Sequence, residues 1–233
     1  MPKFSLVIPC YNEADNLPML VSRCEAALGD TDGEVILVDN GSSDRTADYL
    51  AQRLANQSRI RTVRVAVNRG YGFGILAGLR TAHGEILCWT HADLQTDPRD
   101  VLQGLALFDQ HGPNIFVKGR RRGRPVADVL FTVGMSVFET VLLRRPLWDI
   151  NAQPTMFSKC FFETWQTPPH DFSLDLYAYC QARQAGLVIQ RFPVHFGARV
   201  HGVSHWNINW RSKAKFIRRT LAYSFELKKK LDR

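Results

Sequence analysis

The first half of the chain repeats one pattern four times: a short apolar run rich in β-forming residues, followed by a polar turn. The runs span residues 4–9, 34–39, 60–67 and 85–90, and helical patterns lie between them. Alternating strands and helices predict an α/β fold with a mainly parallel, Rossmann-like sheet and right-handed crossovers. The four turns would then lie at one edge of one sheet, where α/β proteins bind phosphates and metals.

Helices of the first half are predicted over residues 17–28 and from Ser43 and Asp44 to about Leu54. The second half is less regular. Its predicted elements are a strand over residues 114–118, a basic loop over 119–124, helices over 127–143 and 174–185, and a strand over 187–193. No repeat or linker interrupts the chain, so we interpret residues 1–233 as one domain.

The charge balance favours an anionic partner. The chain has 30 Lys and Arg against 22 Asp and Glu, a formal net charge of +8. Such a charge suits a phosphorylated ligand, an acidic membrane surface or nucleic acid, or is simply a soluble basic surface. No nucleic-acid-binding module is recognisable, so we do not expect a nucleic-acid partner.

Several features indicate a cytoplasmic protein. The five cysteines are scattered and form no C-x-x-C pair, which favours reduced thiols. The N-terminus enters a strand pattern directly, without the regions of a secretion signal. The most apolar segment, residues 126–143, contains Asp128 and Glu139, which would be unfavourable inside a bilayer, so no transmembrane helix is expected.

The tail from Trp206 onward mixes aromatic and aliphatic residues with many Lys and Arg. A basic amphipathic helix of this composition suits a membrane surface, a membrane subunit or another anionic partner. With the apolar helix over residues 127–143, it favours a peripheral position at the inner membrane face. The alternative is an ordinary buried helix and a contact in an oligomer.

The polar turns carry four motifs in order: PCYNE at residues 9–13, VDNGSSD at 38–44, NRGYG at 68–72 and HADLQ at 91–95. They resemble the P-x-Y-N-E, V-D-D-G-S-x-D, N-x-G-x-G and D-A-D-x-Q motifs of family 2 glycosyltransferases of GT-A fold. The resemblance extends over about 200 residues and is closest to the dolichyl-phosphate and bacterial polyprenyl-phosphate sugar synthases. Each motif is common by itself, but four in this order are specific.

The resemblance implies a nucleoside-diphosphate-sugar site formed by all four turns. Asp39 is suited to hydrogen bonds from the base or ribose, and Tyr11 to contact with the base. Gly70 and Gly72 would let the backbone approach the diphosphate closely. The expected nucleotide-sugar-binding residues are Pro9, Tyr11, Glu13, Asp39, Asn68, Gly70, Gly72, His91, Ala92 and Asp93.

The D-A-D-x-Q resemblance implies Mg²⁺ or Mn²⁺ held by Asp93, Gln95 and His91. Asp93 would be catalytic, because the ion would neutralise the departing nucleoside diphosphate. The chain departs from the motifs at His91, which replaces an acidic residue, and at Asn40, which replaces an aspartate. Imidazole suits Mn²⁺ or Zn²⁺ better than Mg²⁺, so His91 either ligates the ion or only hydrogen-bonds a phosphate or a loop. These departures also leave open a non-catalytic nucleotide-sugar-binding subunit.

The expected acceptor contacts are Arg121, Arg199 and Ser204. Residues 118–121 stand where the lipid-phosphate branch has its G-S-R turn, and residues 199–204 match its R-x-x-G-x-S element. Guanidinium groups are suited to phosphate.

The resemblance divides the chain into a nucleotide-sugar half at 1–118, an acceptor half at 119–205 and a basic amphipathic tail at 206–233. Residues 149–154 differ from the D-x-x-S-G-F segment that closes over the sugar in relatives, so the sugar stays open, as does the nucleobase.

The implied activity is inverting transfer of a sugar to polyprenyl phosphate at the cytoplasmic membrane face. A phosphate monoester, with a second pKa of about 6, needs no protein base. The alternative acceptor is a glycan hydroxyl, which needs a general base. Asp175 is the candidate base by analogy with other family members, although the sequence favours its interpretation as an ordinary carboxylate near a helix start.

Overall fold

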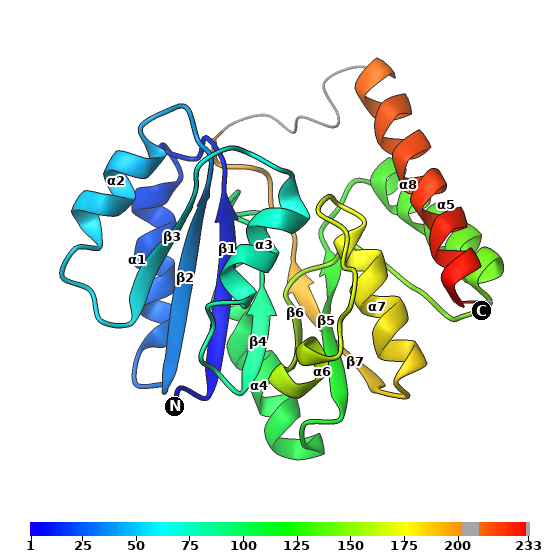
Figure 1. Ribbon diagram of the computed structural model, residues 1–233, viewed down its shortest axis with the longest axis horizontal. Helices are drawn as coiled ribbons and strands as arrows, with labels where there is room; N and C mark the ends of the chain where they lie inside the picture. The colour runs from blue at the N-terminus through cyan, green and yellow to red at the C-terminus, as the bar shows by residue number, and fades with distance from the viewer. Residues whose placement is uncertain (202–209, 232–233) are drawn as a thin grey trace.

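The computed structural model describes residues 1–201 and 210–231, and within them one seven-stranded sheet has the order β3-β2-β1-β4-β6-β5-β7 (Figure 1). The strands are β1 (Phe4–Cys10), β2 (Gly33–Asn40), β3 (Ile60–Val65), β4 (Ile86–Trp89), β5 (Ile115–Arg122), β6 (Thr155–Ser158) and β7 (Val188–His195). β6 runs antiparallel to β4 and β5, and the other neighbours are parallel. The predicted mainly parallel α/β sheet is therefore confirmed.

Helices cover both faces of the sheet. They are α1 (Leu17–Leu28), α2 (Thr46–Arg53), α3 (Tyr71–Leu79), α4 (Asp100–His111), α5 (Val126–Leu143), α6 (Lys159–Glu163), α7 (Leu174–Gln184) and α8 (Trp210–Leu231). α1, α2 and α4 pack on one face against residues such as Leu6 and Ile8. α3, α6 and α7 pack on the other face against Val7 and Trp89. Because central strands are covered on both sides, their apolar runs are nearly continuous.

Some predicted elements were wrong. The basic segment 119–124 was expected to be a loop, but β5 continues to Arg122 because Gly119 through Arg122 pair with Phe192 through His195 of β7. A helix between β3 and β4 was expected without bounds and is α3, whereas α4, the short helix α6 and the antiparallel strand β6 were not predicted. β6 is antiparallel to β4 and β5, and this pairing is a tertiary contact that no local pattern of the sequence encodes.

α5 and α8 pack side by side, to the right of α7 in Figure 1. In the described part of the chain, α5 is the one helix whose length and composition would allow it to cross a membrane, and only 17% of it is buried. Val126 is 75% exposed and Leu130 is 65% exposed. In the described chain this segment is thus not buried as an ordinary core helix would be, and the alternative of a contact in an oligomer stays untested.

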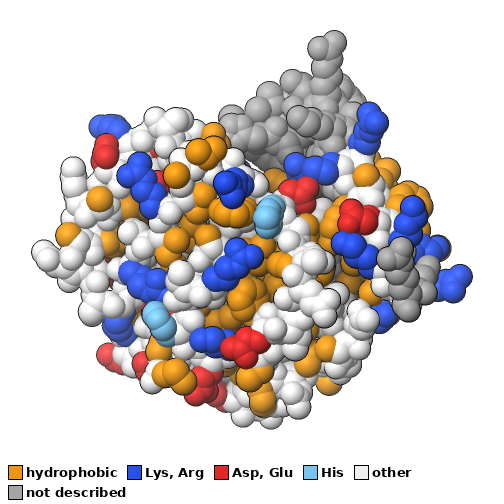
Figure 2. Space-filling view, viewed as in Figure 1, with side chains coloured by type: hydrophobic (Ala, Val, Ile, Leu, Met, Phe, Trp, Pro, Cys, Tyr) orange, Lys and Arg blue, Asp and Glu red, His pale blue; other side chains and the backbone are white. Residues whose placement is uncertain are grey.

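The interface between α5 and α8 contains a polar contact. Ser224 of α8 donates a hydrogen bond to Glu139 Oε1 of α5 at 2.6 Å, and both side chains are buried. Burial raises the pKa of Glu139 to about 7. A titratable carboxyl group is thus enclosed between the two helices. Figure 2 shows many Lys and Arg side chains, with hydrophobic ones among them, on the right of the molecule, where α8 lies.

Candidate functional site

The first two polar turns form one hydrogen-bonded unit. Asn12, at a φ of 55°, donates its N–H to Ser42 Oγ at 3.1 Å, and its Oδ1 accepts from the N–H of Ser43 at 2.8 Å. The N–H of Glu13 donates to Thr46 Oγ1 at 2.9 Å. These contacts fix the ends of β1 and β2 relative to each other, as expected for neighbouring parallel strands.

Asp39 and Tyr11 lie at this shared edge. Asp39 is opposite Cys10 in the register of β2 and β1, and its side chain is 3% exposed. Its Oδ1 accepts from the N–H of Ser42 at 3.0 Å, and Arg64 Nε lies 3.7 Å from its Oδ2. Tyr11 is 39% exposed, so a fixed carboxylate stands near an exposed aromatic ring.

The third turn is attached to the second through Asn40. Its Nδ2 donates to the carbonyl oxygen of Gly70 at 3.0 Å, and Asn68 Oδ1 accepts from the N–H of Gly70 at 2.8 Å. At Gly41, with a φ of +74°, a Cβ atom would lie 2.4 Å from the main-chain nitrogen of Asn68. Asn40 therefore has a structural function that the aspartate of the family motif could not perform in the same way, because a carboxylate cannot donate.

The structure gives a packing reason for the glycines at positions 70 and 72. A Cβ atom at Gly70 would lie 2.5 Å from the carbonyl oxygen of His170, and one at Gly72 would lie 2.7 Å from that of Asp171. The backbone at residues 169–171 is therefore a close neighbour that requires both glycines, and their contact with a diphosphate stays a prediction.

The fourth turn carries Asp93, which is 6% exposed. Its Oδ1 accepts from the N–H of Gln95 at 3.2 Å, and its Oδ2 lies 2.8 Å from Arg199 Nη2. Gln95 is bound to Gly197 twice, through its main-chain oxygen at 2.8 Å and its side-chain Nε2 at 3.0 Å. The turn after β4 is thus held against the segment that follows β7.

His91 lies among groups from several elements. Its ring stacks on Tyr71, with centroids 5.3 Å apart. Burial lowers the pKa of His91, while the carboxylates of Asp93 and Asp175 raise it and the guanidinium groups of Arg199 and Arg121 lower it. The imidazole is therefore neutral at pH 7 and keeps one nitrogen lone pair.

Beside His91 is a buried ion pair that the sequence did not predict. Lys118 Nζ lies 3.7 Å from Asp175 Oδ1, with Lys118 0% and Asp175 1% exposed. Lys118 also donates to Thr155 Oγ1 at 2.6 Å, and Gln153 Nε2 donates to Asp175 Oδ1 at 2.8 Å. Burial raises the pKa of Asp175, which Lys118 partly opposes. Within the described residues, Asp175 Oδ2 has no hydrogen-bond donor.

Arg121 points toward the same region but already has a carboxylate partner. Its guanidinium binds Asp149 Oδ1 through Nε at 2.9 Å and through Nη2. Arg191 Nη2 lies 3.6 Å from the other oxygen of Asp149, and Arg121 lowers the pKa of that carboxyl group. An anion that binds Arg121 must therefore share it with Asp149.

The family profile "Glycosyl transferase family 2" matches residues 5–157. The chain belongs to glycosyl transferase family 2. Among its relatives, an undecaprenyl-phosphate 4-deoxy-4-formamido-L-arabinose transferase of Yersinia enterocolitica is 41% identical over 103 residues, covering 42% of this chain and 31% of the relative. The protein of the same name from Pseudomonas syringae is 40% identical over 110 residues, covering 46% and 32%. The aligned segment thus spans about a third of the length of these relatives.

Solved glycosyltransferase structures share the fold of this family 2 chain. Glucosyl-3-phosphoglycerate synthase from Mycobacterium tuberculosis, in complex with Mn²⁺, UDP and glucosyl-3-phosphoglycerate, has a TM-score of 0.68 and 20% identity, covering 97% of this chain and 80% of that one. A mannosyltransferase from Pyrobaculum calidifontis, in complex with GDP-Man and Mn²⁺, has a TM-score of 0.70 and 22% identity, covering 97% and 64%. At these identities the comparison shows the GT-A fold alone.

The remaining predicted site residues of the glycosyltransferase have varied positions. Pro9 is the last residue but one of β1, and Glu13 lies in the turn that follows it. Burial raises the pKa of Glu13, which lies close enough to Asp93 to be influenced by its charge. Ala92 is 3% exposed and packs in the hydrophobic core, so only its backbone is available to a ligand. Ser204 lies outside the described residues.

Three functional candidates were missed in the sequence: Lys118, Gln153 and Tyr71. The only available signal for Lys118 was a lone charged residue within a buried apolar strand, IFVKG. Gln153 is part of the departure from the family's S-G-F segment, where it stands in the place of the glycine, and Tyr71 is the variable residue between two motif glycines.

The predicted metal ligands form a limited donor set. Within residues 1–201 and 210–231, no group of three or more His, Cys, Asp and Glu side chains is arranged to hold an ion. Asp93 offers one carboxylate and His91 one neutral imidazole. This set fits an ion that takes its other ligands from a diphosphate, and imidazole makes Mn²⁺ the better match than Mg²⁺. Such an ion would replace Arg199 as the partner of Asp93.

Proposed function

We propose that this family 2 chain transfers a glycosyl group from a nucleoside-diphosphate sugar to a polyprenyl phosphate, with inversion, at the cytoplasmic membrane face. One observation carries the proposal. Arg121 and Arg199, the acceptor-side arginines, lie close enough to His91 to influence its ionisation together with Asp93. Cationic groups suited to an anionic acceptor therefore adjoin the turn that is expected to hold the donor's diphosphate.

On the donor side, Tyr11 and Asp39 would bind the base and ribose, and the turns around Asn68 and Glu13 would position the phosphates. Asp93 and His91 would hold a divalent cation, Mn²⁺ or Mg²⁺, together with diphosphate oxygens. When bound, the ion supplies positive charge to the departing nucleoside diphosphate. The sugar itself would lie toward Gln153 and Tyr71, where Gln153 Oε1 has no hydrogen-bond partner in the described structure.

On the acceptor side, an ionised phosphate oxygen would attack the anomeric carbon. The new carbon–oxygen bond forms as the bond from that carbon to the nucleoside diphosphate breaks, and attack from the opposite side inverts the anomeric centre. Arg121 and Arg199 would orient the phosphate monoester, which is mainly ionised near neutral pH because its second pKa is about 6. No proton has to be removed, so no protein base is required.

The α5–α8 pair supports a lipid acceptor. α5 begins four residues after Arg122, the last residue of β5, and exposes apolar side chains including Val126, Leu130 and Phe131. An exposed apolar helix beside basic residues suits the membrane interface, where a polyprenyl phosphate would present its headgroup. The relatives named undecaprenyl-phosphate transferases agree with this assignment.

A second acceptor class is favoured by Asp175. Burial raises the pKa of this carboxyl group, its Oδ2 lacks a donor in the described residues, and His91 lies close to it. These properties suit a general base for a saccharide hydroxyl. In this alternative the hydroxyl proton moves to Asp175 as the oxygen attacks.

The test is transfer of labelled sugar from a panel of UDP-, GDP-, CDP- and dTDP-sugars to polyprenyl phosphate, to the unphosphorylated polyprenol and to saccharides. We expect product only with the phosphate. Asp175→Asn should then keep most of its turnover, judged against the fraction of folded protein. Loss of nearly all turnover in folded Asp175→Asn, with a saccharide as the accepted substrate, would establish the hydroxyl mechanism instead.

A further inference from the structure

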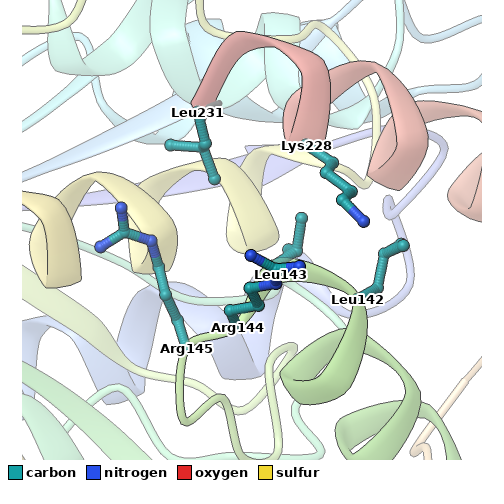
Figure 3. Close-up of a pocket in the computed structure, with 6 residues that line it drawn as sticks. All are labelled: Leu142, Leu143, Arg144, Arg145, Lys228 and Leu231. Carbon is teal, nitrogen blue, oxygen red and sulfur yellow. The ribbon is translucent and has the colours of Figure 1, made fainter. Parts of the chain in front are cut away.

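A cavity of about 320 Å³ lies where the C-terminal ends of α5 and α8 meet. Its lining consists of Leu142, Leu143, Arg144, Arg145, Lys228 and Leu231. Figure 3 shows Lys228 extending from α8 and the two arginines from the end of α5, on opposite sides of the gap between the helices. The cavity therefore combines three positive charges with an apolar wall.

The three cations are not paired with carboxylates in the described part of the chain. Within the described residues, no carboxylate lies within ion-pair distance of Arg144, Arg145 or Lys228, whereas the neighbouring Lys230 pairs with Glu226 at 2.8 Å. Like charges gathered without an acidic partner repel one another, so an anion bound among them would be stabilised.

The backbone at Arg144 is a second, independent indication. Arg144 follows the last residue of α5 with a φ of 54° and a ψ of 36°, the left-handed conformation. Glycine is the usual residue at this position, because a side chain is unfavourable in that conformation. An arginine here accepts backbone strain and directs a guanidinium group to the cavity, a combination typical of ligand-binding positions.

We infer that this cavity binds the phosphate group of an anionic phospholipid, with the cations on the phosphate and the leucines against the glycerol and the first acyl carbons. The apolar surface continues from the cavity along α5, where Val137 is 52% and Val141 is 73% exposed. This continuity favours a lipid over a soluble phosphate. The inference rests on the membrane-facing position of α5 and α8 in the proposed function, and the site is separate from the acceptor contacts at Arg121 and Arg199.

The experiment is co-sedimentation of the full chain with vesicles of phosphatidylcholine alone or mixed equally with phosphatidylglycerol, without donor or acceptor. The test variant is Arg144→Gln/Lys228→Gln. The matched control is Lys229→Gln/Lys230→Gln, which removes the same charge from the same end of α8 but outside the cavity lining. We expect the test variant to lose about tenfold or more in affinity for the anionic vesicles, and the control less than about threefold.

Equal losses in the two variants would overturn the site, because they would indicate general attraction of charges to the membrane. Phosphorus NMR with inorganic phosphate separates the two sources of phosphate. Cavity-dependent binding of inorganic phosphate without a vesicle preference would overturn the lipid assignment. Thermal unfolding monitors folding of each variant. Transfer to a detergent-solubilised acceptor should be unchanged in the test variant, so failure of the proposed glycosyl transfer leaves the vesicle result intact.

Discussion

The four polar turns and the α5–α8 pair differ in how their polar and apolar side chains are placed. In the turns, polar groups bind one another across the ends of neighbouring strands, as in the contacts of Asn12 with Ser43 and of Asn40 with Gly70. In the helix pair, apolar side chains such as Leu130 remain exposed while the carboxyl group of Glu139 is buried. The hydrogen bonds fix the geometry of the turns, whereas the described residues leave much of the apolar surface of α5 uncovered by protein.

The largest expected effect lies in the turns, at Asp93. Asp93→Asn removes the charge that pairs with Arg199 and that would hold a cation at the diphosphate. We expect kcat/KM for glycosyl transfer to fall about a thousandfold, the upper range for loss of one electrostatic group at a reacting centre. Added Mn²⁺ should not restore the activity, and chelation of the wild type should mimic it.

The matched control for that measurement is Asp97→Asn. Asp97 is on the same loop but pairs with Arg99 at 2.9 Å and with Arg23 at 3.9 Å, whereas Arg199 pairs with Asp93. Its substitution should change kcat/KM less than about threefold. Activity of folded Asp93→Asn close to that of Asp97→Asn would exclude a cation-held diphosphate at this turn.

The next largest effect is on the free energy of unfolding and concerns the buried ion pair of Lys118 and Asp175. Lys118→Met leaves the carboxyl group of Asp175 buried without its ion pair, which should lower the free energy of unfolding by about 3 kcal/mol. Because burial raises the pKa of Asp175, its neutral form is the favoured one in the folded variant, and the loss should grow as pH rises through that raised pKa. Urea unfolding at several pH values measures both.

A double variant shows whether the pair is the cause. Lys118→Met/Asp175→Leu removes both charges and should regain most of the lost stability, because apolar residues of similar volume replace buried ion pairs well. If the free energy of unfolding of Lys118→Met lies within about 0.5 kcal/mol of the wild-type value, Lys118 and Asp175 are not coupled as their 3.7 Å separation implies.

The two regions also differ in how far the sequence predicts them. The first four strands and their turns follow from local periodicity and from the rule that ligands bind at the carboxyl ends of parallel strands. Asp39 and Asp93 were placed correctly at one edge by that rule alone. What the sequence did not reveal are contacts between distant segments. The pairing of Lys118 with Asp175, of Asp93 with Arg199 and of Gly70 with His170 depends on tertiary packing, which no local pattern encodes.

Strand ends illustrate the same limit. The arginines after Lys118 read as a loop because basic residues disfavour a buried strand, yet β5 continues through them as pairing with β7 supplies main-chain hydrogen bonds. The glycines at positions 70 and 72 were recognised as parts of a motif, but the backbone segment 169–171 that packs against them was not predicted. For α5, composition identified an apolar helix, whereas its exposure depends on what packs against it.

In the helix pair, the largest expected effect is a pH dependence. Burial raises the pKa of Glu139 from its usual 4.5 to about 7, so the folded state binds the extra proton. The contribution of the protonated Glu139 to the free energy of unfolding is fully present below pH 4.5 and is lost as pH rises through about 7. Glu139→Gln keeps a hydrogen-bonding group beside Ser224 without charge, and should stabilise the protein by about 2 kcal/mol at pH 8.

Urea unfolding of Glu139→Gln at pH 5 and pH 8 checks this, with Glu226→Gln as the control on α8. The side chain of Glu226 is 58% exposed, so its substitution should leave the pH profile nearly unchanged. A wild-type profile that does not fall between these pH values would contradict a neutral Glu139 in the folded state.

A smaller effect is expected at the exposed face of α5. Leu130→Glu places a charge where the helix would meet a membrane, and should weaken binding to anionic vesicles about tenfold, comparable to removing one buried leucine side chain. Its stability should not change, since Leu130 is 65% exposed. Val67→Glu is the control, because Val67 is 68% exposed but lies at the turn after β3. Equal vesicle binding by the two variants would show that α5 does not face the membrane.

The smallest effect isolates the strain at the end of α5. Arg144→Gly relieves the left-handed backbone at a φ of 54° and should raise the free energy of unfolding by about 0.5 to 1 kcal/mol, while weakening binding to anionic vesicles. The same substitution at Arg80, the residue after α3, should have the opposite sign, because Arg80 has a φ of −66° and glycine there only adds freedom to the unfolded chain. Urea unfolding of both variants measures the difference. A stability gain at Arg144 with a loss of vesicle affinity would mean that the strain is retained for the ligand, whereas a stability loss there would mean that the arginine holds the helix end.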